Sequence, residues 1–95
     1  MTFRLTADAQ DDIERIYWDS YDTFGERQAD IYHQGLVDCF EMLDDHPYIG
    51  RDYSEVRQGL RRYEYESHSV YYRVTDTGPL ILRILHRRQD PARHL

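Results

Sequence analysis

Histidine, arginine and tyrosine side chains gather in the second half of the chain, where their types would suit the cleavage of RNA. That reaction needs a base for the 2′-hydroxyl, an acid for the leaving oxygen and cations for the phosphate. The candidate side chains are His68, His86, Arg62, Arg73, Arg83 and Tyr71. A histidine with two arginines on neighbouring strands would supply these groups, so an RNA-cleaving enzyme is one hypothesis.

The end of the chain, which reads LILRILHRRQDPARHL, suggests a binding surface instead. The protein is acidic, with 12 arginines, no lysine, 18 acids and a net charge of −6, yet residues 51–95 hold nine of the arginines and only six acids. The overall sign argues against direct binding of nucleic acid by this chain alone. Arg57, Arg61 and Arg62 can pair with the acidic first half, and the tail, residues 87–95, is left for the fold or for a partner.

The elements that must position these residues follow from the spacing of apolar side chains. Thr6 can cap a helix, and a helical stripe then runs to Gly25, a natural stop. A second stripe predicts a helix over residues 26–45, with Pro47 just beyond its end. The joint around Gly25 is so short that the two helices must form an antiparallel hairpin.

Extended segments surround this hairpin. We expect strands at residues 2–5, 60–66, 67–74 and 80–86, with the TDTG turn before the last one. Strands joined by short links pair antiparallel. The sequence therefore predicts an α+β fold in one domain, residues 1–95, in the order β-α-α-β-β-β, with the helical hairpin on one face of an antiparallel sheet.

Strict alternation along the last two strands would put a mixed set of side chains on the other sheet face. This set is Tyr71, Arg73, Ile81, Arg83 and Leu85. This face is too apolar to be fully exposed to solvent and too charged to be fully buried in a core, so we expect another segment or molecule to cover part of it. The tail is the nearest candidate and a partner protein is the next.

Four pieces of the sequence, in this order and with these gaps, resemble the ParE toxins of the RelE/ParE superfamily. They read R-x-G-L-R-R (57–62), S-H-x-V-Y-Y-R (67–73), R-I-L-H-R-R (83–88) and D-P-x-x-H-L (90–95). A looser likeness lies in A-x-x-D-I at residues 9–13 and G-x-x-Q-A at residues 25–29. Gln89 departs from the family, which commonly has Met there, and this change could alter how the tail packs.

The resemblance implies a toxin of a type II toxin–antitoxin system that inhibits DNA gyrase, a type II topoisomerase, by binding it. It also implies neutralisation by a ParD-type antitoxin whose amphipathic segment wraps the toxin. The residues that we expect to bind the target are Arg83, His86, Arg87, Arg88, Asp90, Pro91 and His94.

The antitoxin should contact the helical hairpin. Trp18 lies well away from the centre of the core stripe, as interface anchors do. Ile31, Gly35 and Met42 make a second stripe, and Gly35 suggests close approach of another backbone. The expected antitoxin contacts are Trp18, Ile31 and Met42, with Tyr71, Ile81 and Leu85 on the open sheet face.

The resemblance also covers the RNA-cleaving hypothesis, because ribosome-dependent mRNA interferases of the RelE type share the fold. Those relatives are strongly basic and rely on lysine, whereas this chain is acidic, has no lysine and carries Ser69 where they often have a basic residue. We therefore expect a binding protein with no catalytic residues, and keep the interferase as the alternative. The histidines and Cys39 show no ligand spacing, so no metal or other cofactor is expected. Without a signal peptide or membrane span, the sequence predicts a cytoplasmic protein.

Overall fold

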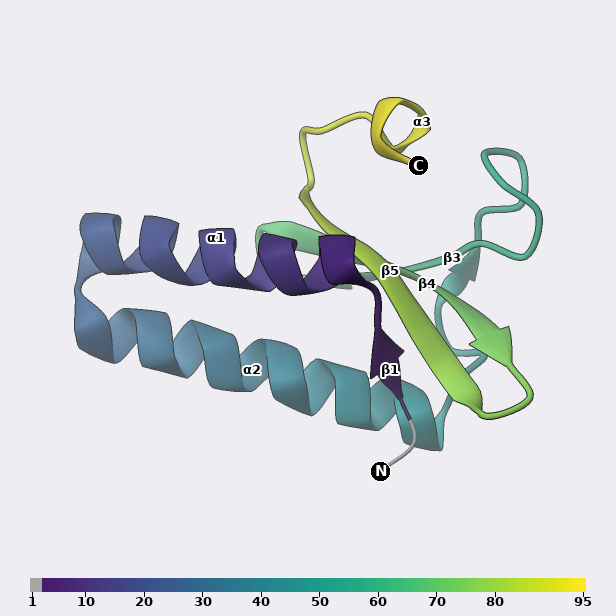
Figure 1. The fold of residues 1–95 in the computed structure, drawn as a ribbon, viewed down its shortest axis with the longest axis horizontal. Coiled ribbons are helices and arrows are strands. Elements are labelled where there is room, and N and C mark those ends of the chain that lie inside the picture. Colours follow the sequence, from purple (N-terminus) through teal and green to yellow (C-terminus); the bar gives the residue numbers. More distant parts are fainter. Residues whose placement is uncertain (1–2) are drawn as a thin grey trace.

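The computed structural model describes residues 3–95, so Thr2 of the expected first strand lies outside the described residues. Two long helices form a hairpin beside a twisted sheet, and a short third helix follows the last strand (Figure 1). In chain order the elements are β1 (Arg4–Leu5), α1 (Ala7–Phe24), α2 (Glu26–Asp45), β2 (Arg51–Asp52), β3 (Arg61–Tyr65), β4 (His68–Thr75), β5 (Gly78–His86) and α3 (Pro91–His94).

The helical hairpin has the boundaries that the caps predict. Thr6 Oγ1 accepts a hydrogen bond from Ala9 N at 3.0 Å, which satisfies a free donor in the first turn of α1. The same hydroxyl donates to Leu82 O at 2.8 Å and thereby ties the start of α1 to β5. Gly25 joins the helices with φ at +91°, a backbone conformation that favours glycine. Within residues 3–95, no helix is both long and apolar enough to cross a membrane.

The sheet is mixed, whereas the sequence predicts an antiparallel one. Its strand order is β1-β5-β4-β3-β2, and β1 pairs with β5 in parallel while the other three pairs are antiparallel. Alternation of apolar and polar side chains indicates a strand, but it does not identify the neighbouring strands or the direction in which they run. The crossover through both long helices carries the chain from β1 to β2 at the opposite edge of the sheet. The strands then return toward β1, so β5 lies between β1 and β4 (Figure 1).

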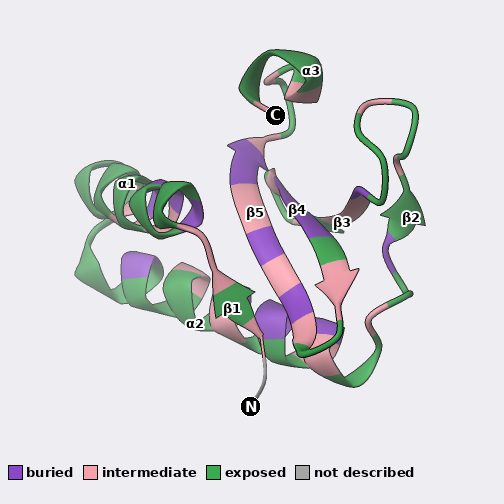
Figure 2. Ribbon diagram, turned by 45° about the vertical axis from the view of Figure 1, so that its right-hand side comes forward, coloured by how far each residue is buried: buried purple, intermediate pink, exposed green. Residues whose placement is uncertain are grey.

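One core fills the space between the helical hairpin and the sheet, and we call it the helix-side core. Figure 2 shows buried residues on the inner faces of both long helices and at intervals along β5. Its buried members are Ala9, Ile16, Leu36, Cys39, Phe40, Leu43, Val70, Tyr72, Ile81 and Ile84. Burial raises the pKa of the Cys39 thiol to about 11, consistent with a packing role for this side chain.

A second, smaller cluster lies on the opposite face of the sheet. Its buried members are Leu60, Tyr71 and Leu85, and the side chains packed against them are Tyr53, Val56, Leu82 and Leu95. We call it the tail-side cluster, because Leu95 belongs to the tail. The expectation that the tail covers part of this face is confirmed, and the loop before β3 covers another part.

A register shift in β5 overturns part of the predicted alternation. Tyr71 pairs with Arg83 but Tyr72 pairs with Ile81, so β5 holds one extra residue at Leu82. Such a bulge changes which face the following side chains occupy. Ile81 and Ile84 therefore both lie in the helix-side core, and the expectation that Ile81 sits on the open face is wrong.

Candidate functional site

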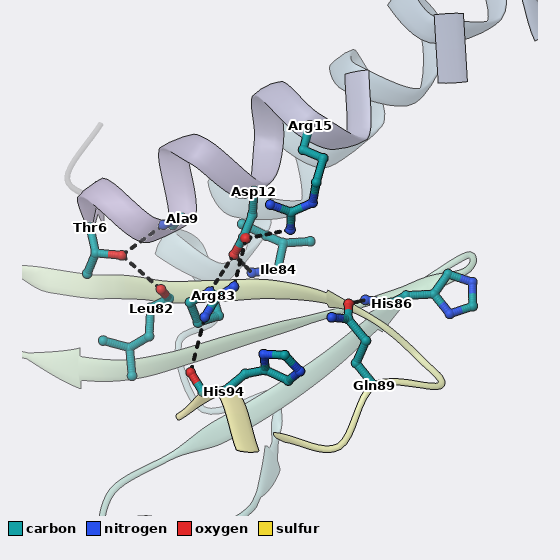
Figure 3. Close-up of polar contacts among 10 residues, drawn as sticks. All are labelled: Thr6, Ala9, Asp12, Arg15, Leu82, Arg83, Ile84, His86, Gln89 and His94. Carbon is teal, nitrogen blue, oxygen red and sulfur yellow. Dashed lines mark hydrogen bonds and ion pairs between the residues drawn. The ribbon is translucent and has the colours of Figure 1, made fainter. Parts of the chain in front are cut away.

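A buried carboxylate on α1 organises the junction between the helical hairpin and the tail. The side chain of Asp12 is only 1% exposed and points at β5 (Figure 3). Its Oδ2 accepts hydrogen bonds from Arg83 Nε at 2.7 Å and from Ile84 N at 2.9 Å. Its Oδ1 accepts from Arg83 Nη2 at 3.0 Å and from Arg15 Nη2 at 2.8 Å. Both oxygens are therefore satisfied, as a buried charge requires.

These contacts keep Asp12 ionised. Burial alone would raise the pKa of the carboxyl, but the hydrogen bonds from Arg83, Ile84 N and Arg15 outweigh it, so the pKa of Asp12 lies below its ordinary value of 3.8. The same pairing raises the pKa of Arg83. The result is a persistent ion pair between the first helix and the last strand.

The third nitrogen of the Arg83 guanidinium reaches the tail. Its Nη1 donates to His94 O at 3.1 Å, so a single arginine bridges α1 and α3 (Figure 3). At the other end of the tail, Gln89 Oε1 accepts from His86 N at 2.8 Å, so this departure from the family pattern has its own polar partner. Asp90 caps α3 by accepting from Ala92 N at 3.0 Å, with Pro91 in the first turn.

The expected target-binding residues divide into exposed and internal ones. Arg87, Arg88, Asp90 and His94 are exposed, and Pro91 is half-buried. Arg83 is largely internal, with a side chain that is 19% exposed and held by Asp12. The surface that another molecule can reach is therefore the tail itself, and Arg83 lies beneath it.

His86 faces a different feature, a groove of about 800 Å³ between the hairpin tip and the turn that joins β3 to β4. We call it the histidine groove. The rings of His86 and His68 meet edge to face across the paired strands, with 5.5 Å between their centroids. His68 Nδ1 lies 2.7 Å from Tyr32 Oη. Burial, followed by the effects of His86 and Arg15, lowers the pKa of His68.

The side chains considered for RNA cleavage do not converge on one cationic site. Arg62 bonds Ser69 Oγ at 3.1 Å and Glu64 Oε1 at 2.6 Å, whereas Arg83 is paired with Asp12. Tyr71 is buried in the tail-side cluster. Each arginine is held by its own carboxylate, and neither arginine nor Tyr71 lines the histidine groove that His68 and His86 share.

The basic residues before the tail also differ from expectation. Arg61 donates to Gly50 O at 2.7 Å and lies over the Tyr48 ring, 4.9 Å from its centroid. In the part of the chain that the structure describes, no ion pair joins Arg57, Arg61 or Arg62 to the acidic helices. The ion pair between these helices and the basic second half is made by Arg83, through Asp12 on α1.

The helical hairpin exposes an apolar groove on the side of β1, with a volume of about 430 Å³. We call it the apolar groove. Its apolar and aromatic lining residues are Phe3, Leu5, Ile13, Tyr17, Trp18, Val37 and Phe40. Trp18 is 51% exposed and packs edge to face against Tyr17 and at a tilt against Tyr21, so a large aromatic surface is open to a partner.

The other expected antitoxin contacts lie elsewhere. Ile31 is exposed but lines the histidine groove, and Met42 is half-buried against the helix-side core. Tyr71, Ile81 and Leu85 are 2%, 0% and 0% exposed, so they form cores and present no open face. The expectation of an open, partner-facing sheet surface is wrong for these three residues.

Gly35 has an internal explanation. A Cβ atom at this position would lie 1.8 Å from Tyr65 Oη and 2.6 Å from its Cζ. Glycine in the middle of α2 therefore makes room for the Tyr65 ring, which packs against Tyr32. The close approach that the sequence suggests comes from this side chain and not from another backbone.

Comparison with known proteins decides what kind of molecule this is. Residues 3–91 match the family model described as ParE toxin of type II toxin-antitoxin system, parDE. The chain belongs to the ParE toxin family. It is 36% identical over 94 residues to Toxin ParE1 of Mycobacterium tuberculosis, which covers 98% of this chain and 96% of that protein. It is 34% identical over 93 residues to Toxin ParE1 of Caulobacter vibrioides, with the same coverage.

A solved structure supports the same assignment for the fold. The structure titled "Chromosomal ParDE TA system from P. aeruginosa" matches with a TM-score of 0.78 and 25% identity over 90% of this chain and 95% of that one. This ParE toxin is thus the toxin component of a type II toxin–antitoxin system. Asp12 and Arg83, which the sequence shows in two separate ParE-like pieces, meet in the structure.

Asp12 is the functional candidate that the sequence analysis missed. It lies three residues after Ala9 and four before Ile16, so it shares the buried face of α1 with both. An acid in the middle of an apolar stripe is a signal for a buried partner of opposite charge. Acids near the start of a helix have a common electrostatic explanation, which hides that signal.

Proposed function

We propose that this ParE toxin inhibits DNA gyrase by binding it, and that the exposed tail makes the contact. The observation that carries the proposal is the pairing of family membership with a basic tail held on the body of the protein through Arg83. Arg87 and Arg88 are exposed and have no ion pair among the described residues. They offer planar, charged donors to an acidic protein surface or to the DNA that gyrase holds.

A function in binding without catalysis is also supported by the contacts of the histidine and arginine side chains, which already have partners within the protein. A general acid or base must reach its substrate, and a phosphate needs free cations near it. His68 has one ring nitrogen against Tyr32, and Arg62 and Arg83 are each paired with a carboxylate. These arrangements favour the gyrase inhibitor over the RelE-like interferase, which remains the second candidate.

We further propose that a ParD-type antitoxin neutralises the toxin by laying an amphipathic helix into the apolar groove. Helix-in-groove recognition uses apolar anchors spaced along one helix face. The groove supplies a matching apolar floor, and Trp18 at its rim has the size and exposure of an interface anchor. Because the groove lies on the hairpin and not on the tail, antitoxin binding and target binding would use separate surfaces. Gyrase acts in the cytoplasm, where we accordingly place the toxin.

A supercoiling and DNA-cleavage assay with purified gyrase tests the proposal. The wild-type toxin should block supercoiling and increase cleaved DNA, and the double variant R87A/R88A should lose most of this effect. R27A/R57A is the matched control, because it removes the same charge from two exposed positions outside the tail. Cleavage of mRNA in translating ribosomes, with no effect on gyrase, would replace the proposal with the interferase.

A further inference from the structure

We propose that Asp12 and Arg83 are positioning residues that hold the tail in its binding geometry, an inference that rests on the proposed role of the tail. Neither residue needs to touch the target. Asp12 fixes the Arg83 guanidinium with two hydrogen bonds, and the fixed guanidinium then offers Nη1 to the backbone of α3 at His94. The carboxylate on the first helix thus sets the position of the last one.

The tail has few other means of keeping its place. α3 spans four residues, Pro91–His94, which is too short to be stable by itself in water. Its ion pair between Arg93 and Asp90 is long, at 4.0 Å, and largely exposed, so it contributes little. What remains is the turn after His86, the bond from Arg87 N to Ser67 O, the packing of Leu95 on the tail-side cluster and the bond from Arg83. Arg83 is the one polar link from the body of the protein to α3 among these contacts.

The geometry of Arg83 also explains why an arginine is needed. Nε and Nη2 face the two Asp12 oxygens, and Nη1 is left for the His94 carbonyl. A lysine at this position carries the same charge on a single nitrogen. It can pair with the buried carboxylate, but it cannot hold the carboxylate in a fork and reach α3 together. Arg83→Lys therefore separates the ion pair that supports the fold from the bond that positions the tail.

The first experiment compares R83K with R73K, a matched control at an exposed arginine on the neighbouring strand. Hydrogen exchange of the Arg93 and Leu95 amides, which bond Asp90 O and Pro91 O, reports the order of α3 directly. For the loss of one charge-assisted hydrogen bond, we expect these amides to exchange about ten-fold faster in R83K and the inhibition of gyrase to weaken about ten-fold. R73K should match the wild type in both, and unchanged exchange and potency in R83K would overturn the inference.

A second variant covers the case in which R83K fails to fold. Asp12→Leu/Arg83→Met replaces the buried pair with apolar side chains of similar size, a change that often preserves stability. If the pair merely supported the fold, this variant would recover both an ordered tail and inhibition. We expect instead a cooperative unfolding transition that lies below that of the wild type, because Ile84 N loses its acceptor, together with fast exchange in α3 and weak inhibition. An ordered α3 in this variant would refute the positioning role.

Hydrogen exchange and gyrase inhibition test the positioning role and the proposed target separately. Exchange in α3 depends only on the toxin, so it tests the link from Asp12 to the tail whatever the target is. If the wild-type protein leaves gyrase unaffected, the proposed target fails while the exchange data still decide whether Asp12 and Arg83 order the tail.

Discussion

Replacing Asp12 with alanine should destabilise the toxin more than any change at an exposed acid of the same helix. Removing one member of a buried ion pair typically costs about 3–5 kcal/mol, because the partner charge stays buried without compensation. Arg83 is 19% exposed and can recover some hydration, so we expect about 3 kcal/mol, the lower end of that range. The loss includes the buried Ile84 N–H, which is left without its acceptor when the carboxylate is removed.

Urea unfolding followed by circular dichroism measures this effect. A small domain has a free energy of unfolding of about 5–10 kcal/mol, so the urea midpoint should fall by about 30–60% if the dependence of that free energy on urea concentration is unchanged. The matched control is Asp11→Ala, at the exposed neighbouring position, which should cost less than about 1 kcal/mol. If Asp12→Ala cost no more than the control, the ion pair would not hold α1 to β5 as the geometry indicates.

Three further predictions concern pH, packing and recognition. The folded state holds Asp12 at a pKa below its ordinary value, so its contribution to the free energy of unfolding is complete at neutral pH and declines as pH falls through the folded pKa. The difference in free energy of unfolding between the wild type and Asp12→Asn should therefore narrow in acid, and a constant difference would contradict this. Gly35→Ala should destabilise the protein by about 1–3 kcal/mol despite the better helix propensity of alanine, because the new Cβ meets Tyr65, and in a Tyr65→Ala background the same change should become stabilising. An equal effect in both backgrounds, measured by urea unfolding, would exclude the clash. Trp18→Ala should weaken antitoxin binding by about 30-fold or more, as measured by isothermal titration calorimetry, whereas Tyr48→Ala, at another exposed aromatic residue, should not. Equal affinities of the two variants would show that the antitoxin does not bind in the apolar groove.

Local signals predicted the helical hairpin well, because its determinants are close in sequence. Thr6 caps α1 through a residue three positions away, and Gly25 supplies the positive φ that ends one helix and starts the next. The TDTG turn likewise joins β4 to β5 at the expected residues. Each feature depends on a few neighbouring side chains, which periodicity and capping rules describe directly.

Long-range features were beyond the same rules. The parallel pairing of β1 with β5 joins residues about 76 positions apart, and no local pattern encodes it. The bulge at Leu82 shifts Ile81 into the helix-side core, and a single inserted residue leaves no mark on an apolar run such as LILRIL. Charge counts indicated that the two halves of the chain attract each other, but only the three-dimensional contacts show that Asp12 is the acid that Arg83 meets.

The position of β5 in the sheet has a consequence for how the polypeptide acquires its shape during synthesis. This strand lies between β1 and β4, yet it is the last strand to be made. Until it emerges, β1 has no hydrogen-bonding neighbour and α1 and α2 have no complete surface on which to bury their apolar sides. Pairing elements so distant along the chain is entropically expensive and slow. Throughout the synthesis of residues 1–77, the helical hairpin of a nascent toxin therefore lacks the strand against which it packs in the folded protein.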